Sequence, residues 1–129
     1  MAQRPAVTGY PRRGEVHVVS FDPVRGREIS KTRPALIIQN DRGNESSEST
    51  VVALMTSRVS DRAYPMHVVV GSEESGLDGR STVLTEQVQT VDQSRLGSRT
   101  GMLLPPTMHE VDRAIHFSLG LMGCPIRRG

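Results

Sequence analysis

The sequence predicts a mainly β fold, a small and strongly bent antiparallel barrel that ends in one C-terminal helix. Short runs of strand-forming residues alternate with turn-forming residues over residues 15–104, whereas a helical spacing of apolar residues appears only after residue 107. Because helices do not alternate with strands, the pattern argues against an α/β fold. A chain of 129 residues is the size of one domain with a modest core.

The first predicted strand covers residues 15–21, which are rich in β-branched and aromatic side chains. His17 alternates with valines, so we place it on the less buried face of this strand. An eleven-residue loop, 22–32, follows and carries much of the local charge. Loops of this length between strands are often functional, with a solvated surface loop as the alternative. Its charged residues near the next strand are Arg25, Arg27, Glu28 and Lys31.

The stretch 31–41 contains the central predicted strand, the apolar run 35–38. Pro34 fits the first residue of such a strand, and it pushes Arg33 toward an extended backbone. The sequence therefore predicts that the guanidinium of Arg33 is held at the start of a rigid strand. The alternative is an ordinary surface arginine.

Further strands are predicted at residues 50–56, 64–70, 81–90 and 99–104, with turns at 40–49 and 71–80 and one helical turn at 92–96. A terminal helix follows. Thr107 and Glu110 have the spacing of a capping box, and apolar residues then recur every three to four positions up to Met122. That stripe predicts a core or dimer contact. Gly123 is expected to end the helix, and Pro125 prevents its continuation.

Charge is unevenly distributed in this chain. The formal net charge is +2, yet residues 1–33 carry seven basic and three acidic side chains. This balance permits a nucleic-acid partner without requiring one. Nearly all the basic residues are arginines, whose forked guanidinium matches phosphate geometry; Lys31 is the only lysine. Aromatic residues make up 3% of the chain, which argues against a base-stacking platform of the RRM or OB kind.

Several other functional classes are disfavoured by composition. The single cysteine, Cys124, excludes an internal disulfide and a zinc site built from two cysteine pairs. No apolar run approaches the length of a membrane span, and no signal peptide opens the chain, so we expect a cytoplasmic protein with no membrane contact. His109 and His116 have no third ligand nearby, and we expect no metal and no cofactor. Residues 1–11 are expected to be a disordered extension, 12–123 the domain and 124–129 a tail.

Several motifs, in this order and spacing, resemble the MazF/PemK/Kid toxins of bacterial toxin–antitoxin systems. They are Arg13-Gly14-Glu15-Val16; Asp22-Pro23 and Gly26-Arg27-Glu28 leading to Arg33-Pro34; Leu36-Ile37-Ile38-Gln39-Asn40-Asp41; Thr56 at the end of its strand; Pro65-x-His67-Val68; and Glu86-Gln87-x-x-Thr90-Val91-Asp92. The resemblance covers Arg12 to about Met122. It implies an SH3-like barrel with a C-terminal helix, arranged as a homodimer.

The resemblance also implies a metal-independent endoribonuclease that cuts single-stranded RNA at a short sequence. RNA cleavage of this kind uses the 2′-hydroxyl as the nucleophile and leaves 2′,3′-cyclic phosphate and 5′-hydroxyl ends. The family's catalytic arginine matches Arg33, its strand-end threonine matches Thr56, and its acidic loop residue matches Glu28. An antitoxin of the MazE type, with an acidic and disordered tail, is the implied partner. A non-enzymatic toxin of the CcdB kind, which binds gyrase through the same fold, is the alternative.

RNA contacts are expected from the polar and charged residues near these three positions. They are Arg25, Arg27, Lys31, Gln39, Asn40, Ser57, Arg58, His67, Glu86 and Gln87. Arg27, Ile29 and Gln89 depart from the residues usual in the family, so we expect a changed RNA sequence preference. If Glu28 is not the base, His67 and Glu86 are the next candidates.

Overall fold

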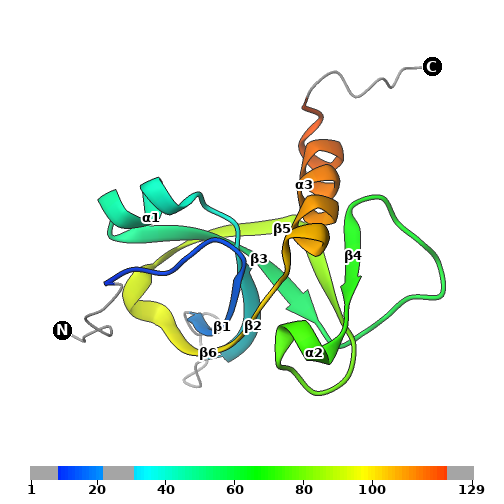
Figure 1. The fold of residues 1–129 in the computed structure, drawn as a ribbon, viewed down its shortest axis with the longest axis horizontal. Coiled ribbons are helices and arrows are strands. Elements are labelled where there is room, and N and C mark those ends of the chain that lie inside the picture. The colour runs from blue at the N-terminus through cyan, green and yellow to red at the C-terminus, as the bar shows by residue number, and fades with distance from the viewer. Residues whose placement is uncertain (1–8, 22–30, 122–129) are drawn as a thin grey trace, which may run out of the picture.

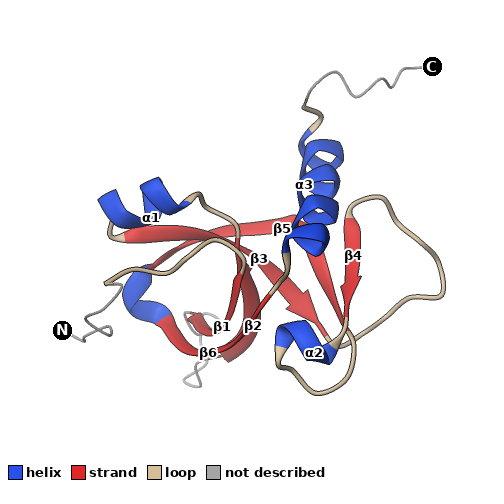
Figure 2. Cartoon of the chain, viewed as in Figure 1, coloured by secondary structure: helices blue, strands red, loops and turns tan. Residues whose placement is uncertain are grey.

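The computed structural model describes residues 9–21 and 31–121, and this part of the chain is built mostly from strands (Figures 1 and 2). In chain order the elements are β1 (Glu15–Phe21), β2 (Lys31–Ile37), α1 (Asp41–Ser46), β3 (Ser49–Thr56), β4 (His67–Val70), α2 (Ser72–Ser75), β5 (Ser81–Asp92), the 3-10 helix η1 (Gln93–Arg95), β6 (Leu96–Met102) and α3 (Pro105–Leu119). None of the helices in the described ranges is long and apolar enough to cross a membrane.

The strands form one antiparallel sheet in the order β4-β5-β3-β2-β1-β6. The mainly β fold with a C-terminal helix is therefore confirmed. The sheet bends strongly, but its edge strands β4 and β6 do not pair with each other in the described structure. The predicted barrel thus remains an open one.

A large bulge interrupts the pairing of β5 with β3. Ala53 of β3 pairs with Val88, but the next residue, Leu54, pairs with Leu84. The three residues between, 85–87, have no partner on β3. Thr85 is fully buried, and its hydroxyl donates to the backbone carbonyl of Met66 at 2.6 Å. Bulges bend a strand and redirect its side chains, so this anchored bulge determines where Glu86 and Gln87 lie.

The sheet buries a different apolar cluster on each of its two faces. One face packs against α3, and its cluster includes Leu36, Met55 and Val83 from the strands with Val111 and Ala114 from the helix. The other cluster lies where the sheet curls over itself, and consists of Val19, Ala35, Ile37, Val52, Leu54 and Val91 with Phe21 and Leu96 beside them. Figure 1 shows that α3 packs against β4 and β5, so this helix does not cover the second face of the sheet.

The terminal helix differs from the prediction at both ends. It begins at Pro105 and ends at Gly120, which has a left-handed backbone with φ of 69°, rather than at Gly123. The predicted capping box does not form, because Thr107 lies inside the first turn. Its hydroxyl donates to Glu74 Oε2 at 2.9 Å, while Glu74 Oε1 accepts from the backbone N–H of Leu104 at 2.8 Å. A carboxylate from α2 therefore caps α3.

Several other boundaries also differ from the predicted ones. The central strand begins at Lys31, so Pro34 is its fourth residue rather than its first. Pro34 is tolerated there because β3 pairs with β2 only along residues 35–37. The N–H that proline lacks would therefore have had no hydrogen-bond acceptor in the β2–β3 pairing. Residues 64–66 form a turn ahead of β4 instead of extending the strand. The short helices α1 and α2 occur where only turns were expected, and β6 starts three residues early, at Leu96.

Candidate active site

Arg33 and Thr56 lie at neighbouring ends of the paired strands β2 and β3. The pairing ends at Ala35 and Leu54, and each predicted catalytic residue lies two positions beyond this last pair. The half-buried Arg33 donates from Nη2 to the carbonyl of Met55 at 3.2 Å, which holds the guanidinium at the end of β3. The two residues predicted to be catalytic are thus brought together by strand pairing.

Thr56 ends β3 with its hydroxyl in a defined local geometry. Its Oγ1 accepts from the backbone N–H of Arg58 at 3.2 Å, and Thr82 in turn donates to the carbonyl of Arg58 at 2.7 Å. Because Oγ1 accepts in the first of these bonds, its own O–H hydrogen remains able to donate. No described residue accepts a hydrogen bond from it. Thr56 can therefore donate to an incoming anion.

The residues of this site share the face of the sheet that α3 does not cover. Thr56 pairs with Thr82, and Leu84 pairs with both Leu54 and His67. Residues two apart on a strand point to the same side, so these side chains lie on one surface together with Arg33. Thr56 lines a cavity of about 530 Å³, which we call the Thr56 hollow. The lining residues are Thr56, Arg58, Val59, Ser60, His67, Thr82 and Leu84.

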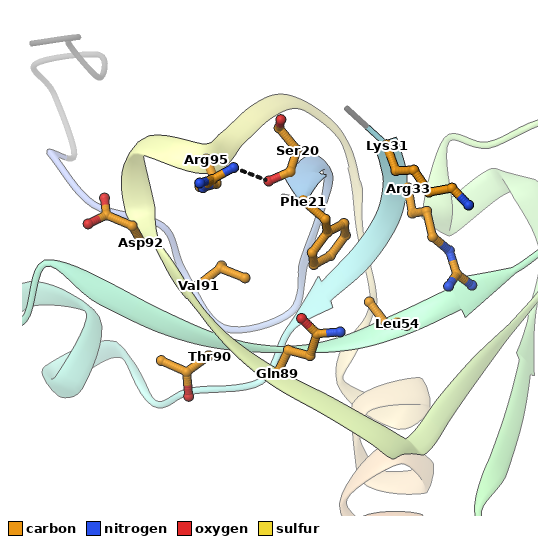
Figure 3. Close-up of a pocket in the computed structure, with 10 residues that line it drawn as sticks. All are labelled: Ser20, Phe21, Lys31, Arg33, Leu54, Gln89, Thr90, Val91, Asp92 and Arg95. Carbon is orange, nitrogen blue, oxygen red and sulfur yellow. Dashed lines mark hydrogen bonds between the residues drawn. The ribbon is translucent and has the colours of Figure 1, made fainter. Parts of the chain in front are cut away.

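A second cavity of about 530 Å³, the Phe21 hollow, has Arg33 and Leu54 in its wall (Figure 3), and Leu54 pairs with Leu84 of the Thr56 hollow. In Figure 3 the Phe21 ring lies between Arg95 on one side and Lys31 and Arg33 on the other. Arg95 Nη1 donates to the carbonyl of Ser20 at 3.5 Å. The lining residues are Ser20, Phe21, Lys31, Arg33, Leu54, Gln89, Thr90, Val91, Asp92 and Arg95.

The Phe21 hollow contains residues that the sequence analysis did not assign to a site, among them Phe21, Gln89, Asp92 and Arg95. The signal was faint: Gln89 departs from the family pattern, and Arg95 is one cation in a predicted helical turn. The pKa of Asp92 is lowered, first by the hydrogen bonds that it accepts from Ser94 and then by the charge of Arg95. The hollow therefore combines three cations with one carboxylate that stays ionised.

A comparison with known protein families identifies the family of this chain. Residues 12–119 match the model of the PemK-like, MazF-like toxins of type II toxin–antitoxin systems. The chain belongs to this toxin family. The resemblance predicted from the motifs is therefore confirmed over nearly the whole domain.

Solved structures agree with that membership. An endoribonuclease from a mycobacterial species, solved in complex with its cognate antitoxin, is 27% identical; the match covers 87% of this chain and 97% of that one, with a TM-score of 0.71. The Mycobacterium tuberculosis toxin MazF-mt6 is 26% identical over 84% of this chain and 98% of its own, with a TM-score of 0.70. The MazE–MazF structure from Deinococcus radiodurans, 24% identical, covers 88% and 98% with a TM-score of 0.72, and shows the shared fold.

The toxin uses two of its predicted RNA-binding residues to hold its own structure. Gln39 Nε2 donates to Asn44 Oδ1 at 2.9 Å and to the carbonyl of Ser49 at 3.2 Å. Asn40 caps α1, and its Oδ1 accepts from the N–H of Gly43 at 2.7 Å. Both follow β2, at the opposite end of the strand from Arg33. The structure therefore separates this pair from the candidate active site.

The other predicted residues divide between the site and positions outside the described ranges. Lys31, Arg58 and His67 line the two hollows, Glu86 contacts His67, and Ser57 and Gln87 are exposed beside them. Arg25, Arg27 and Glu28 lie outside the described residues. Over residues 9–21 and 31–121, no three His, Cys, Asp or Glu side chains are grouped so that they can hold a metal ion.

Proposed function

We propose that this toxin is a metal-independent endoribonuclease that cuts single-stranded RNA at a short sequence. The observation that carries the proposal is the position of Arg33 and Thr56 at neighbouring ends of β2 and β3, where each lines an open hollow. The mycobacterial relative, described as an endoribonuclease, supports the same class of reaction. The nucleophile is the 2′-hydroxyl of the RNA, so the products carry 2′,3′-cyclic phosphate and 5′-hydroxyl ends.

Arg33 and Thr56 have complementary roles in this reaction. The guanidinium stays protonated at any physiological pH, so Arg33 stabilises the negative charge that builds on the phosphorane and does not carry a proton. Thr56 donates one further hydrogen bond to a phosphate oxygen. Both groups are held before RNA binds, Arg33 by Met55 and Thr56 by the chain around Arg58. Preorganised donors of this kind act most strongly where charge develops in the transition state.

The two hollows provide room for the nucleotides on either side of the scissile phosphate. In the Phe21 hollow, an aromatic ring offers a stacking surface, and Lys31 and Arg95 lie where they can contact phosphates. Gln89 offers an amide that can hydrogen-bond a base edge. We therefore assign the sequence preference of this toxin partly to the Phe21 hollow.

The assembly proposed for this toxin has two partners. We propose a homodimer, supported by exposed apolar side chains such as Val88, Phe117 and Leu119. We also propose that an antitoxin with an acidic segment neutralises the toxin, since the relative above was solved with its cognate antitoxin. The proposed contact includes the basic residues Arg25 and Arg27, which lie outside the described residues.

The decisive experiment incubates the purified toxin with a long single-stranded RNA in EDTA and analyses the cut ends. We expect cleavage with 5′-hydroxyl ends. Arg33→Ala and Thr56→Ala should each slow single-turnover cleavage by on the order of 10²–10³-fold, because each removes a preorganised donor. Arg33→Lys should recover only part of this loss, since a point charge cannot reproduce the guanidinium fork.

Arg42→Ala is the matched control. It removes an exposed arginine from α1, beyond the far end of β2, and should cleave at the parent rate. Thermal melting of each variant separates loss of chemistry from loss of fold. Uncut RNA, cleavage that requires added magnesium, or parent rates in both Arg33→Ala and Thr56→Ala would each contradict the proposal.

A further inference from the structure

His67, in the wall of the Thr56 hollow, contacts Glu86, and the reaction described above leaves this pair without a role. His67 Nε2 lies 3.1 Å from Glu86 Oε2. We propose that His67 is the general base that takes the proton from the attacking 2′-hydroxyl, and that Glu86 is the residue that positions it. This inference rests on the proposed ribonuclease function and deepens it.

Both members of the pair are held by the fold rather than by each other alone. Glu86 follows Thr85 in the β5 bulge, and Thr85 is pinned by hydrogen bonds to the Met66 carbonyl and from Ser118. His67 begins β4, and its backbone N–H donates to the carbonyl of Tyr64 at 3.0 Å. The Tyr64 ring meets the imidazole edge-to-face at 5.2 Å between centroids. The imidazole is therefore confined to one position in the hollow.

The contact with Glu86 also selects one tautomer of the imidazole. A carboxylate only accepts hydrogen bonds, so Nε2 carries the proton and Nδ1 keeps its lone pair. No described residue forms a hydrogen bond with Nδ1. An unprotonated ring nitrogen beside an orienting carboxylate is the arrangement that general-base histidines use.

The chemical step balances with these groups. The 2′-hydroxyl gives its proton to Nδ1 as its oxygen bonds to phosphorus, and the bond from phosphorus to the 5′-oxygen breaks. Water donates a proton to the leaving 5′-oxygen, and the imidazolium then returns its proton to the hydroxide so formed. Arg33 and Thr56 stabilise the charged phosphorane between these events. The contact with Glu86 also stabilises the imidazolium that the step creates.

Charged groups around the imidazole come from three segments. Glu86 lies on β5, Arg58 follows β3 in the same hollow, and Arg62 stacks on the Tyr64 ring, 5.7 Å from its centroid. A histidine base should make the rate fall on the acid side, because a protonated imidazole cannot accept the proton of the 2′-hydroxyl.

The test measures single-turnover cleavage of a short RNA as a function of pH. His67→Ala should cut about 10²–10⁴-fold more slowly, lose the acid limb of its pH profile, and regain activity when imidazole is added to the buffer. Glu86→Gln should be slower and should shift the acid limb to lower pH, because the imidazolium loses its charged partner. His109→Gln, which changes an exposed histidine of α3, should behave as the parent.

Each outcome decides between the two proposals. If the parent toxin does not cut RNA, the ribonuclease function itself fails. If the parent cuts and His67→Ala keeps the parent's pH profile, or raises only KM without imidazole rescue, His67 binds RNA and is not the base. If the acid limb of the pH–rate profile lies at the same pH in Glu86→Gln and in the parent, the positioning role of Glu86 is likewise overturned. Melting curves for both variants exclude misfolding as the cause of a lower rate.

Discussion

Glu74 offers a sharp test of how this fold is held together. Its carboxylate accepts from the backbone N–H of Leu104 at 2.8 Å and from the Thr107 hydroxyl at 2.9 Å, so a four-residue helix caps a fifteen-residue one. Loss of an N-cap costs about 0.5–2 kcal/mol, and a typical hydrogen bond contributes about 0.5–1.5 kcal/mol. A negative charge at a helix N-terminus contributes about 0.3–1 kcal/mol more.

Glu74 is only half-buried and Leu104 is exposed, so water replaces part of what the substitution removes. We therefore expect Glu74→Ala to lower the free energy of unfolding by about 2 kcal/mol. For a chain of this size that corresponds to a drop in Tm of about 6–10 °C. Urea unfolding and calorimetry measure both quantities. RNA cleavage below the melting transition should stay near the parent rate, because α3 covers the face of the sheet opposite Arg33.

Glu73→Ala is the matched control, since it removes the neighbouring carboxylate of α2, which is exposed. Its effect on stability should be within about 0.5 kcal/mol. Combining Glu74→Ala with Thr107→Ala should give a loss smaller than the sum of the two single losses. Equal stabilities of Glu74→Ala and Glu73→Ala, or full additivity with Thr107→Ala, would refute the proposed cap.

Two further predictions concern other parts of the fold. Burial tends to raise the pKa of Glu15, yet hydrogen bonds from His17 and the Arg12 backbone, with the charge of Arg99, hold that pKa below its ordinary 4.5. The ionised Glu15 side chain therefore stabilises the fold at pH values above its pKa in the unfolded chain, and this contribution is lost as the pH falls through its lower pKa in the folded protein. The difference in unfolding free energy between the parent and Glu15→Gln, measured by urea titration, should accordingly become smaller from neutral pH to about pH 3. Gly101→Ala should prevent stable folding, seen as lost cooperative melting, because its new Cβ would overlap the Glu74 carbonyl oxygen.

The candidate site illustrates how far local patterns reach. The Arg33-Pro34 pair and the strand-end Thr56 were identified from sequence, since each is a feature of a few neighbouring residues. Their juxtaposition depends on the register of β2 against β3, which strand pairing sets across 22 residues of chain. The Phe21 hollow was missed because its walls come from β1, β2, β3, β5 and η1. Gln39 and Asn40 look equally available in the sequence, but the structure commits both to hydrogen bonds around α1.

The succession of strands, the terminal helix and the family can be read from the sequence alone, because alternation, turn residues and motif spacing are local properties of each segment. Which distant groups meet depends on the folded sheet. The tertiary structure replaced the expected Thr107–Glu110 capping box with Glu74, a residue more than 30 positions away, and it brought His67 to Glu86 through a bulge in β5. Such contacts depend on how the strands pair and bend once apolar residues are buried. The free energy of that burial is a property of the whole sheet and not of any one segment.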